Sequence, residues 1–316
     1  MNMVTLQFPK VQNNAQLDKK IEISVCVCTY KRPSLLSKLL DSLSSQRCDL
    51  AFEVVVVDND PMGSGGDAVN AARQAHPHLK LRYEIESNKG ISFARNTAVS
   101  MATGAFVAWI DDDETATVDW LNKLSLAQKV SDADALFGPV LPIFPENSPP
   151  WTKRGGLFDR PRHQTGAPID AREARTGNAF VKASWLRLES PPFDISLANT
   201  GGEDFDFFTR IEAKGAQFKW CDEAEVFELV PLERQRLSWI LERRLRSSAH
   251  YWRSQPAPFV VGAVRGLVGA ALFLVLSLVG VIAAPFGFHR AVKVWGRAMG
   301  SLGRAVAISG ITWKGY

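Results

Sequence analysis

The chain has 316 residues, 46% of them hydrophobic, which is enough for one large domain or two smaller ones with a sizeable core. Residues 1–242 carry 27 basic and 33 acidic residues, a formal net charge of −6, whereas residues 243–316 carry ten cations and no acidic residue. Basic tails of this kind contact nucleic acid or membranes, and the long apolar stretches here favour a membrane and count against nucleic acid.

The N-terminal residues and the cysteines narrow the class further. Residues 1–20 contain no apolar stretch typical of a signal peptide, so we expect an N-terminal extension and a catalytic part that stays in the cytoplasm. The four cysteines form no pair of CxxC motifs. We therefore expect buried, reduced thiols and neither a zinc site nor a disulfide framework.

Strands and helices alternate along the first part of the chain. Near-continuous apolar runs predict strands at 21–28, 52–58, 79–86 and 105–111. Helical spacing or composition predicts helices at 33–46, 65–76, 91–102 and 118–130. Strands that alternate with helices in this way predict an α/β fold, with a mostly parallel, Rossmann-like sheet flanked by helices.

The second part of the chain is less regular. Residues 139–175 are rich in proline, glycine and arginine, which predicts a long loop region that acts as an acceptor lid. A strand and then a helix are expected over 175–188, a helix over 201–215, and a strand over 216–229. Residues 237–253 form an amphipathic helix lined with arginines.

An uncharged segment lies in the C-terminal tail. Residues 266–288 contain no Asp, Glu, Lys, Arg or His and would form a helix of about 34 Å, against a bilayer core of roughly 30 Å. Membrane anchorage through about residues 259–288 is therefore expected. The alternative is an unusually long and apolar core helix.

Basic residues flank this segment on both sides, so a single crossing would leave five cations on the far side of the membrane. Pro285 and Gly287 offer a place for the chain to turn. The pairs Gly262-xxx-Gly266 and Gly296-xxx-Gly300 offer small faces on which two helical arms can pack. We therefore predict a re-entrant or hairpin insertion with the C-terminus on the cytoplasmic side.

Polar groups follow three of the predicted strands. The strands end in CTYKR (28–32), DNDP (58–61) and DDDE (111–114). Ligands of parallel α/β sheets bind at the carboxyl ends of the strands, so these groups mark a candidate binding edge. Four adjacent carboxylates repel one another unless a metal ion or basic groups compensate them. The alternatives are helix and turn capping, a solvated turn, or a structural calcium site.

Four motifs in order resemble a known family. They are ISVCVCTYKRP, EVVVVDNDP, SNKGISFARNTAVSMATGAFVAWIDDDE and GGEDFDFFTRI. The chain resembles the family 2 glycosyltransferases with the GT-A fold, and within them the bacterial exopolysaccharide transferases of the succinoglycan ExoM type. The resemblance implies a GT-A domain over 21–253, with a nucleotide-binding half over 21–115 and an acceptor half over 116–253. The basic, apolar tail, 254–316, would follow it as a membrane-associated helical segment.

The resemblance also implies an activity. The family transfers a hexose from a nucleotide diphosphate sugar to a saccharide acceptor, with inversion at the anomeric carbon and with Mg²⁺ or Mn²⁺ as cofactor. We expect a UDP-linked donor and a lipid-linked oligosaccharide acceptor for exopolysaccharide or other cell-surface polysaccharide, made on the cytoplasmic face of the plasma membrane. Other polysaccharide-assembly proteins are expected partners. The alternative is a non-catalytic, membrane-anchored protein that binds nucleotide sugars or acts as a scaffold.

Residue roles follow by motif. Asp113 and Asp111 would hold the metal, and Asp112 would face the ribose or the metal shell. Many relatives have a His after the last core strand, where this chain has Phe227, and Glu228 is a weak substitute. Asp204 would be the general base for the acceptor hydroxyl, while Glu203 and Asp206 are its competitors, with helix-capping roles as the alternative. The residues expected at the nucleotide are Thr29, Tyr30, Asp58 and Asn59 for the nucleoside, and Arg32, Gly90 and Arg95 for the diphosphate.

Some of these roles have structural alternatives. Arg95 is also suited to anchoring a helix to the sheet. Candidates for the acceptor or the diphosphate are Trp151, Gly177, Asn178, Arg243, Arg244, Arg246 and His250. Trp151 is equally suited to packing its own loop. The arginines are equally suited to an anionic membrane surface.

Overall fold

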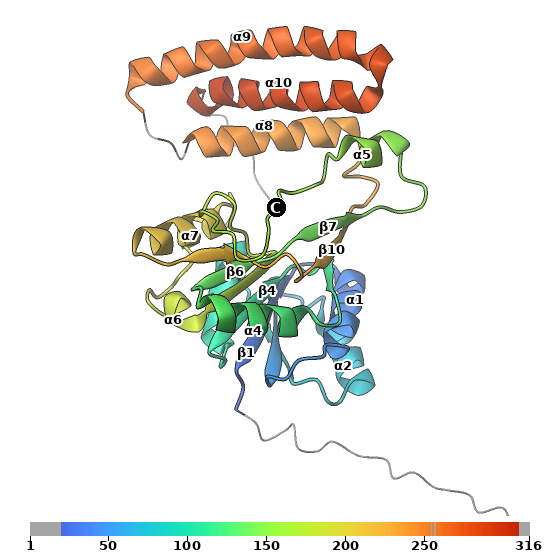
Figure 1. Ribbon diagram of the computed structural model, residues 1–316, viewed down its shortest axis with the longest axis vertical. Coiled ribbons are helices and arrows are strands. Elements are labelled where there is room, and N and C mark those ends of the chain that lie inside the picture. The colour runs from blue at the N-terminus through green and yellow to red at the C-terminus, as the bar shows by residue number, and fades with distance from the viewer. Residues whose placement is uncertain (1–19, 254, 256, 310–316) are drawn as a thin grey trace, which may run out of the picture.

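The computed structural model describes residues 20–253, 255 and 257–309 (Figure 1). The expected N-terminal extension, apart from Lys20, and the last residues of the tail lie outside the described part.

A seven-stranded sheet forms the centre of the globular part, with the order β3-β2-β1-β4-β8-β6-β9. Its strands are β1 (Ile23–Thr29), β2 (Phe52–Asp58), β3 (Leu81–Ile85), β4 (Phe106–Ile110), β6 (Ala135–Phe137), β8 (Asn178–Lys182) and β9 (Phe218–Trp220). All pairs are parallel except those that β8 makes with β4 and with β6. The predicted α/β fold with a mostly parallel sheet is confirmed.

Helices cover both faces of this sheet. One core packs β1 and β2 against α1 (Pro33–Ser44), α2 (Gly66–Ala75) and α4 (Trp120–Ser131). The other packs the opposite face against α3 (Ile91–Met101), α6 (Ala183–Leu186) and α7 (Glu203–Ala213), and a short helix, η2 (Ile195–Leu197), follows α6. The near-continuous apolar strands of the sequence are therefore buried on both sides, as in other parallel sheets.

A second, three-stranded sheet has the order β5-β10-β7. It contains β5 (Glu114–Ala116), β10 (Val226–Leu229) and β7 (Val140–Ile143). Two expectations are therefore wrong. The expected loop region 139–175 contains β7 and the helix α5 (Pro150–Gly155), and the single strand expected over 216–229 is divided between β9 and β10, which belong to different sheets.

Three C-terminal helices form a separate layer on one side of the globular part (Figure 1). They are α8 (Leu237–Arg253), α9 (Phe259–Ala283) and α10 (Phe288–Ile308). A short helix, η3 (Ala284–Phe286), and Gly287, with a φ of 133°, reverse the chain between α9 and α10. The predicted turn at Pro285 and Gly287 is confirmed, and α10 lies between α9 and α8.

Glycines bring these helices into close contact, but not the pairs that the sequence suggested. A Cβ at Gly269 would lie 2.4 Å from the Ser301 carbonyl oxygen, and one at Gly280 would lie 2.2 Å from the Trp295 ring. Gly262 and Gly300 have no such neighbour within 4 Å, and Gly296 faces Arg244 of α8. Of the four predicted glycines, Gly266 alone lies in the α9–α10 contact, against Ile308.

Asn178 joins three segments at the start of β8. Its Oδ1 accepts a bond from Trp120 Nε1 (2.9 Å), and its Nδ2 donates to the carbonyl oxygens of Pro139 (3.1 Å) and Ala224 (2.7 Å). Because the Trp120 and Asn178 side chains are buried, Asn178→Ala would leave Trp120 Nε1 and the Ala224 carbonyl oxygen without partners, whereas the Pro139 carbonyl oxygen keeps the N–H of Val226.

We expect Asn178→Ala to lower the free energy of unfolding by about 2 kcal/mol or more, since each of the two orphaned buried groups costs roughly 1–3 kcal/mol. Thermal unfolding followed by tryptophan fluorescence measures the change. The matched control is Asn70→Ala, an exposed position on α2, for which a change within about 0.5 kcal/mol is expected. Equal effects of the two variants would contradict this structural role.

Candidate active site

A cavity of about 590 Å³ opens at the carboxyl end of β4. Its lining comes from the end of β4, the segment 157–177, the start of β8, the first turn of α7, and α8. Asp111, Asn178 and Asp204, which are far apart in the sequence, all line it. The predicted binding edge of the sheet therefore borders a real cavity.

Arginine side chains stand opposite the carboxylates of residues 111–114. Arg32 Nη1 donates to Asp112 (2.9 Å) and to Asp113 (3.3 Å). Thr29 Oγ1 also donates to Asp112 (2.8 Å). Arg234 Nη2 donates to the same Asp113 oxygen from the other side (3.2 Å). Asp112 and Asp113 are thereby held in place by cations from two distant parts of the chain.

A second group of ion pairs extends this cluster into the segment after residue 115. Glu228 on β10 accepts from Arg160 (2.6 Å) and from Arg234 (2.9 Å), and its backbone pairs with that of Glu114. The sequence analysis missed Arg160 and Arg234. The arginine-rich composition of residues 139–175 was the one sequence feature that pointed to Arg160. No sequence motif pointed to Arg234. Glu228 was considered as a metal ligand, but here both of its oxygens receive arginine donors.

Asp111 and Glu114 form the buried side of the cluster. A Cβ at Gly177 would lie 3.0 Å from Glu114 Oε1 and 3.2 Å from Asp111 Oδ2, so the two carboxylates converge there. Burial raises the pKa of Asp111 to about 6, although Arg95 opposes the shift. Burial and the charge of Asp111 raise the pKa of Glu114 well above its usual value. Glu114 Oε1 is buried and has no hydrogen-bond partner.

The donor set suits a hard divalent cation. Among the described residues, no three acidic, His or Cys side chains converge as a complete metal site. Mg²⁺ is commonly held by one or two carboxylates together with substrate phosphates and water. The carboxylates of Asp111 and Asp113 fit that pattern, and the unpartnered Glu114 oxygen adds a further acceptor beside Asp111.

The three acidic residues at the start of α7 have different surroundings. Glu203 is buried and forms an ion pair with Arg95. Asp206 accepts from Arg210 one turn further along the helix (2.9 Å). Asp204 forms no ion pair with another described residue, and it lines the cavity. Asp204 is therefore available to an acceptor. Arg95 lines the cavity as well, but it is paired with Glu203 of α7.

At the expected nucleoside end, polar side chains shape the loops. Asp58 accepts from Tyr83 (3.0 Å) and from the backbone of Gly65 (2.6 Å). Asn59 donates to the carbonyl oxygens of Glu86 and Asn88 and accepts from Gly90 N, so both of its N–H donors are used within the protein. The expected role of Asn59 at the nucleoside therefore has no free N–H donor of this side chain to support it.

Tyr30 presents an exposed ring on the same side of the sheet. The ring is 39% exposed, and the ammonium groups of Lys31 and Lys89 lie 5.3 and 5.8 Å from its centroid. An aromatic face between two cations suits the stacking of a base next to phosphates.

The expected acceptor residues do not all border the cavity. Asn178, Gly177, Arg243 and Arg244 line it. Trp151 lies instead against Phe288 of α10, with ring centroids 5.2 Å apart, and Arg246 is near Glu242 on α8 (3.7 Å). The His250 ring covers Gly202 at the start of α7, and burial lowers the pKa of its imidazole, with Arg253 adding to the effect.

A family model for glycosyl transferase family 2 matches residues 24–187, more than half of the chain. The chain belongs to glycosyl transferase family 2. It is 35% identical to the succinoglycan biosynthesis protein ExoM of Rhizobium meliloti, over 75% of this chain and 76% of that protein. It is also 27% identical to the hyaluronan synthase of Pasteurella multocida, over 64% of this chain and 24% of that protein.

Solved structures share the fold. The chain of S. aureus TarS 1–349 in complex with UDP-GlcNAc has a TM-score of 0.54 at 16% identity, with 92% of each chain covered. The mannosyltransferase PcManGT from Pyrobaculum calidifontis, in complex with GDP-Man and Mn²⁺, has a TM-score of 0.53 at 21% identity, over 94% of this chain and 77% of that chain. Family and fold confirm the expected GT-A glycosyltransferase.

The unpartnered Glu114 oxygen yields a prediction about stability. The pKa of Glu114 is higher in the folded than in the unfolded state, so the protonated form is favoured by folding. The contribution of protonated Glu114 to the free energy of unfolding is fully present below the pKa that this group has in the unfolded state. The contribution is lost as the pH rises through its pKa in the folded state. A glutamine would carry no charge at any pH and could donate toward Asp111.

We therefore expect Glu114→Gln to raise the free energy of unfolding near neutral pH by about 1–3 kcal/mol. The gain should disappear near pH 4, about the pKa of an unperturbed glutamate. Thermal unfolding in excess chelator measures it at both pH values. Glu233→Gln, at an exposed position, serves as the control without effect. A destabilised Glu114→Gln protein near neutral pH would contradict the argument.

Proposed function

We propose that this chain is an inverting, metal-dependent hexosyltransferase that uses a nucleotide diphosphate sugar, with UDP as the expected nucleotide. The observation that carries the proposal is the position of Asp204. It lines the same cavity as Asp111, and its acidic neighbours on α7 already have arginine partners. A structural neighbour binds UDP-GlcNAc and another binds GDP-Man with Mn²⁺, which supports the donor class.

The donor would lie between Tyr30 and the carboxylate cluster. A divalent metal held by Asp111 and Asp113 would supply positive charge to the diphosphate, which must leave with an extra negative charge. Arg32 and Arg234 already flank Asp113, and they supply guanidinium donors of the type that binds phosphate oxygens.

Asp204 would act as the general base. The acceptor hydroxyl oxygen forms a bond to the anomeric carbon, its proton passes to the Asp204 carboxylate, and the bond from that carbon to the diphosphate oxygen breaks. Because attack and departure occur on opposite faces of one carbon, the configuration inverts. Asp204 lies in the first turn of α7, at the positive end of the helix dipole.

The acceptor is proposed to be a lipid-linked saccharide of exopolysaccharide assembly at the cytoplasmic face of the plasma membrane. The similarity to the succinoglycan biosynthesis protein supports the pathway class. The described residues include one helix that is long and apolar enough to cross a membrane, Phe259–Phe286, and 11% of its most apolar window is buried. Binding to the membrane that holds a lipid-linked acceptor would account for this exposed apolar surface.

Asp204→Asn keeps the shape of the side chain but removes the proton acceptor. We expect turnover to fall at least about 10²-fold, the usual contribution of a general base, with little change in donor affinity. Release of nucleotide diphosphate from a panel of UDP- and GDP-sugars measures turnover, and thermal shift measures donor binding. Asp206→Asn, which weakens one of the two carboxylate contacts of Arg210, is the matched control. An active Asp204→Asn protein beside an inactive Asp206→Asn protein would refute the assignment.

Metal removal gives a second test. Excess chelator should abolish turnover and weaken nucleotide binding, and Mn²⁺ or Mg²⁺ should restore both. Asp113→Ala should lose turnover even with metal present, because the side chain that would hold the metal is missing. Full turnover in excess chelator would rule out a metal-dependent transferase.

A further inference from the structure

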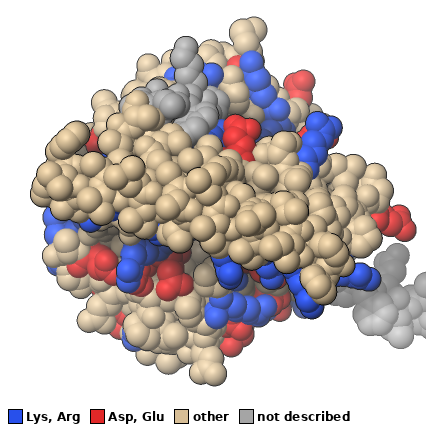
Figure 2. All heavy atoms as spheres, turned by 90° about the horizontal axis from the view of Figure 1, so that it is seen from above, with Lys and Arg blue, Asp and Glu red and all other residues tan. Residues whose placement is uncertain are grey.

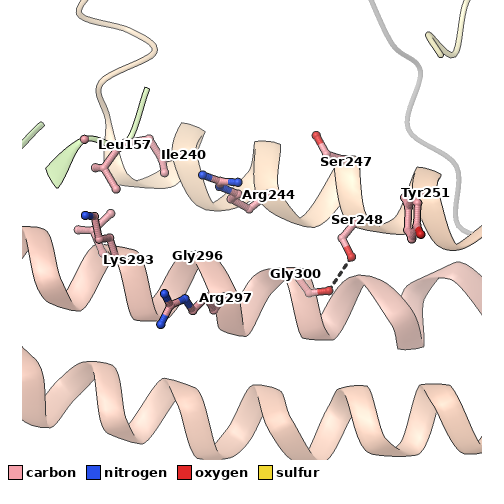
Figure 3. Close-up of a pocket in the computed structure, with 12 residues that line it drawn as sticks. Leu157, Ile240, Arg244, Ser247, Ser248, Tyr251, Lys293, Gly296, Arg297 and Gly300 are labelled. Carbon is pink, nitrogen blue, oxygen red and sulfur yellow. Dashed lines mark hydrogen bonds between the residues drawn. The ribbon is translucent and has the colours of Figure 1, made fainter. Parts of the chain in front are cut away.

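A second cavity lies between α8 and α10, next to the active-site cavity (Figure 3). Its volume is also about 590 Å³. Arg244 of α8 and Lys293 and Arg297 of α10 line it, together with the hydroxyl-bearing Ser247 and Ser248. We call it the basic groove. Three cations and the hydroxyl group of Ser247 form a donor set suited to phosphate oxygens.

The cations of the basic groove have no acidic partner within the described residues. The ion pairs of the described chain do not include Arg244, Lys293 or Arg297, and all three side chains are exposed. The sequence from 243 onward contains no Asp or Glu at all. The positive charge of the groove is therefore left for an external anion.

The helices that form the groove are held rigidly together. Ser248 Oγ donates to the Gly300 carbonyl oxygen (2.6 Å), and a Cβ at Gly303 would lie 2.6 Å from Ser248 Oγ. The groove is therefore a preformed feature of the α8–α10 contact.

The basic groove adjoins the active-site cavity. Four residues line both: Leu157, Ile240, Arg244 and Ser247. One ligand can therefore place an anionic group between α8 and α10 and a sugar hydroxyl next to Asp204.

The exposed apolar surface of α9 indicates that such a ligand lies in a membrane. Leu267, Leu274 and Leu278 of α9 are 73%, 68% and 64% exposed. Seen from the side of the C-terminal helices, an uncharged band crosses the molecule, with Lys and Arg side chains along its edge (Figure 2). Apolar surface of this extent bordered by cations is typical of a helix that binds a membrane interface with anionic lipids.

The packing of α10 sets how α9 meets the membrane. Because α10 runs alongside α9, a crossing by α9 would take Arg290, Lys293 and Arg297 into the hydrocarbon region as well. Charges at the centre of a bilayer are strongly disfavoured. Lying in the membrane plane, α9 reaches the acyl boundary while α10 and the basic groove stay at the level of the headgroups.

We propose that the basic groove binds the phosphate or diphosphate of a lipid-linked acceptor, whose hydrocarbon chain lies in the bilayer beside α9. This inference rests on the proposed transferase function, and it assigns the acceptor class and the residues that hold it. Arg244 lines both the basic groove and the active-site cavity, whereas Lys293 and Arg297 line only the basic groove.

The test uses the full chain and vesicles of three compositions. Phosphatidylcholine alone reports binding by α9. Phosphatidic acid in phosphatidylcholine presents a headgroup that can carry two negative charges, as the diphosphate of a lipid-linked saccharide does, and phosphatidylglycerol presents a singly charged phosphate diester at matched surface charge. We expect tighter binding to phosphatidic acid than to phosphatidylglycerol. The variant Lys293→Gln/Arg297→Gln should lose roughly tenfold or more of its affinity for phosphatidic acid, since each cation near an anionic surface contributes about fivefold.

The matched control is Arg154→Gln/Arg236→Gln, which removes two exposed cations outside the groove. It should keep the preference for phosphatidic acid, and both variants should bind phosphatidylcholine as the original protein does. Three results would overturn the proposal. They are no preference in the original protein, a preference retained by the groove variant, and a preference lost equally in the control.

Free inorganic pyrophosphate separates the two sources of phosphate. If it binds the detergent-solubilised protein as tightly as phosphatidic acid vesicles do, the groove takes a soluble anion and the lipid assignment is wrong. Thermal shift with UDP-sugars keeps the transferase question separate. The groove variant should bind donor normally, and failure of the original protein to bind any nucleotide sugar would refute the proposed function while leaving the vesicle result in place.

Discussion

Repulsion among the carboxylates of residues 111–114 is the constraint on which the site depends. These groups follow a buried strand, where water screens them poorly. Arg32, Arg160 and Arg234 compensate them, and each comes from a different part of the chain: after β1, from the segment between α5 and β8, and after β10. The cluster therefore ties residues 21–115 to the segments that carry Arg160 and Arg234. Because a bound diphosphate would bring more negative charge, the same arginines suit both the empty and the loaded site.

The sequence could predict the elements whose signals are local. Strands β1, β2 and β4 are near-continuous apolar runs, and α1 has leucines at helical spacing, so each was recognisable alone. Strands β5, β7 and β10 were not, because each has three or four residues and is defined by pairing with distant segments.

The residues of the site also divide into those with a local sequence signal and those without one. Asp204 and the DDDE stretch carry a family motif, whereas Arg160 and Arg234 act through ion pairs across the fold that no local pattern records. Asn59 and Asn178 show a further limit, since each side chain makes hydrogen bonds within the protein that no local sequence pattern records.

The C-terminal helices illustrate a further limit of sequence reasoning. Counting uncharged residues correctly found the apolar segment and its turn at Pro285 and Gly287. It could not show that α10, with its cations, would pack along the whole hairpin, nor that Gly269 and Gly280 would form the contact in place of the GxxxG pairs. Hydropathy is a property of one helix considered alone. The free energy of inserting that helix into a bilayer also depends on the helices packed against it, which would enter the bilayer with it. A hairpin of two crossing arms is therefore less favourable for this chain than a helix lying in the interface.

The order of the three helices also sets the distance between membrane and active site. Packed helices lie about 8–10 Å apart, so α8 lies roughly 16–20 Å below the axis of α9 if the three stack in one direction. A lipid phosphate in the basic groove would sit between these levels, and the cavity beneath α8 would meet whatever extends from that phosphate. The hydrocarbon chain and the first linkage would stay at the membrane, and a sugar unit further along would reach Asp204. This arrangement suits a transferase that extends a saccharide already built on a lipid better than one that adds the first sugar to the lipid itself.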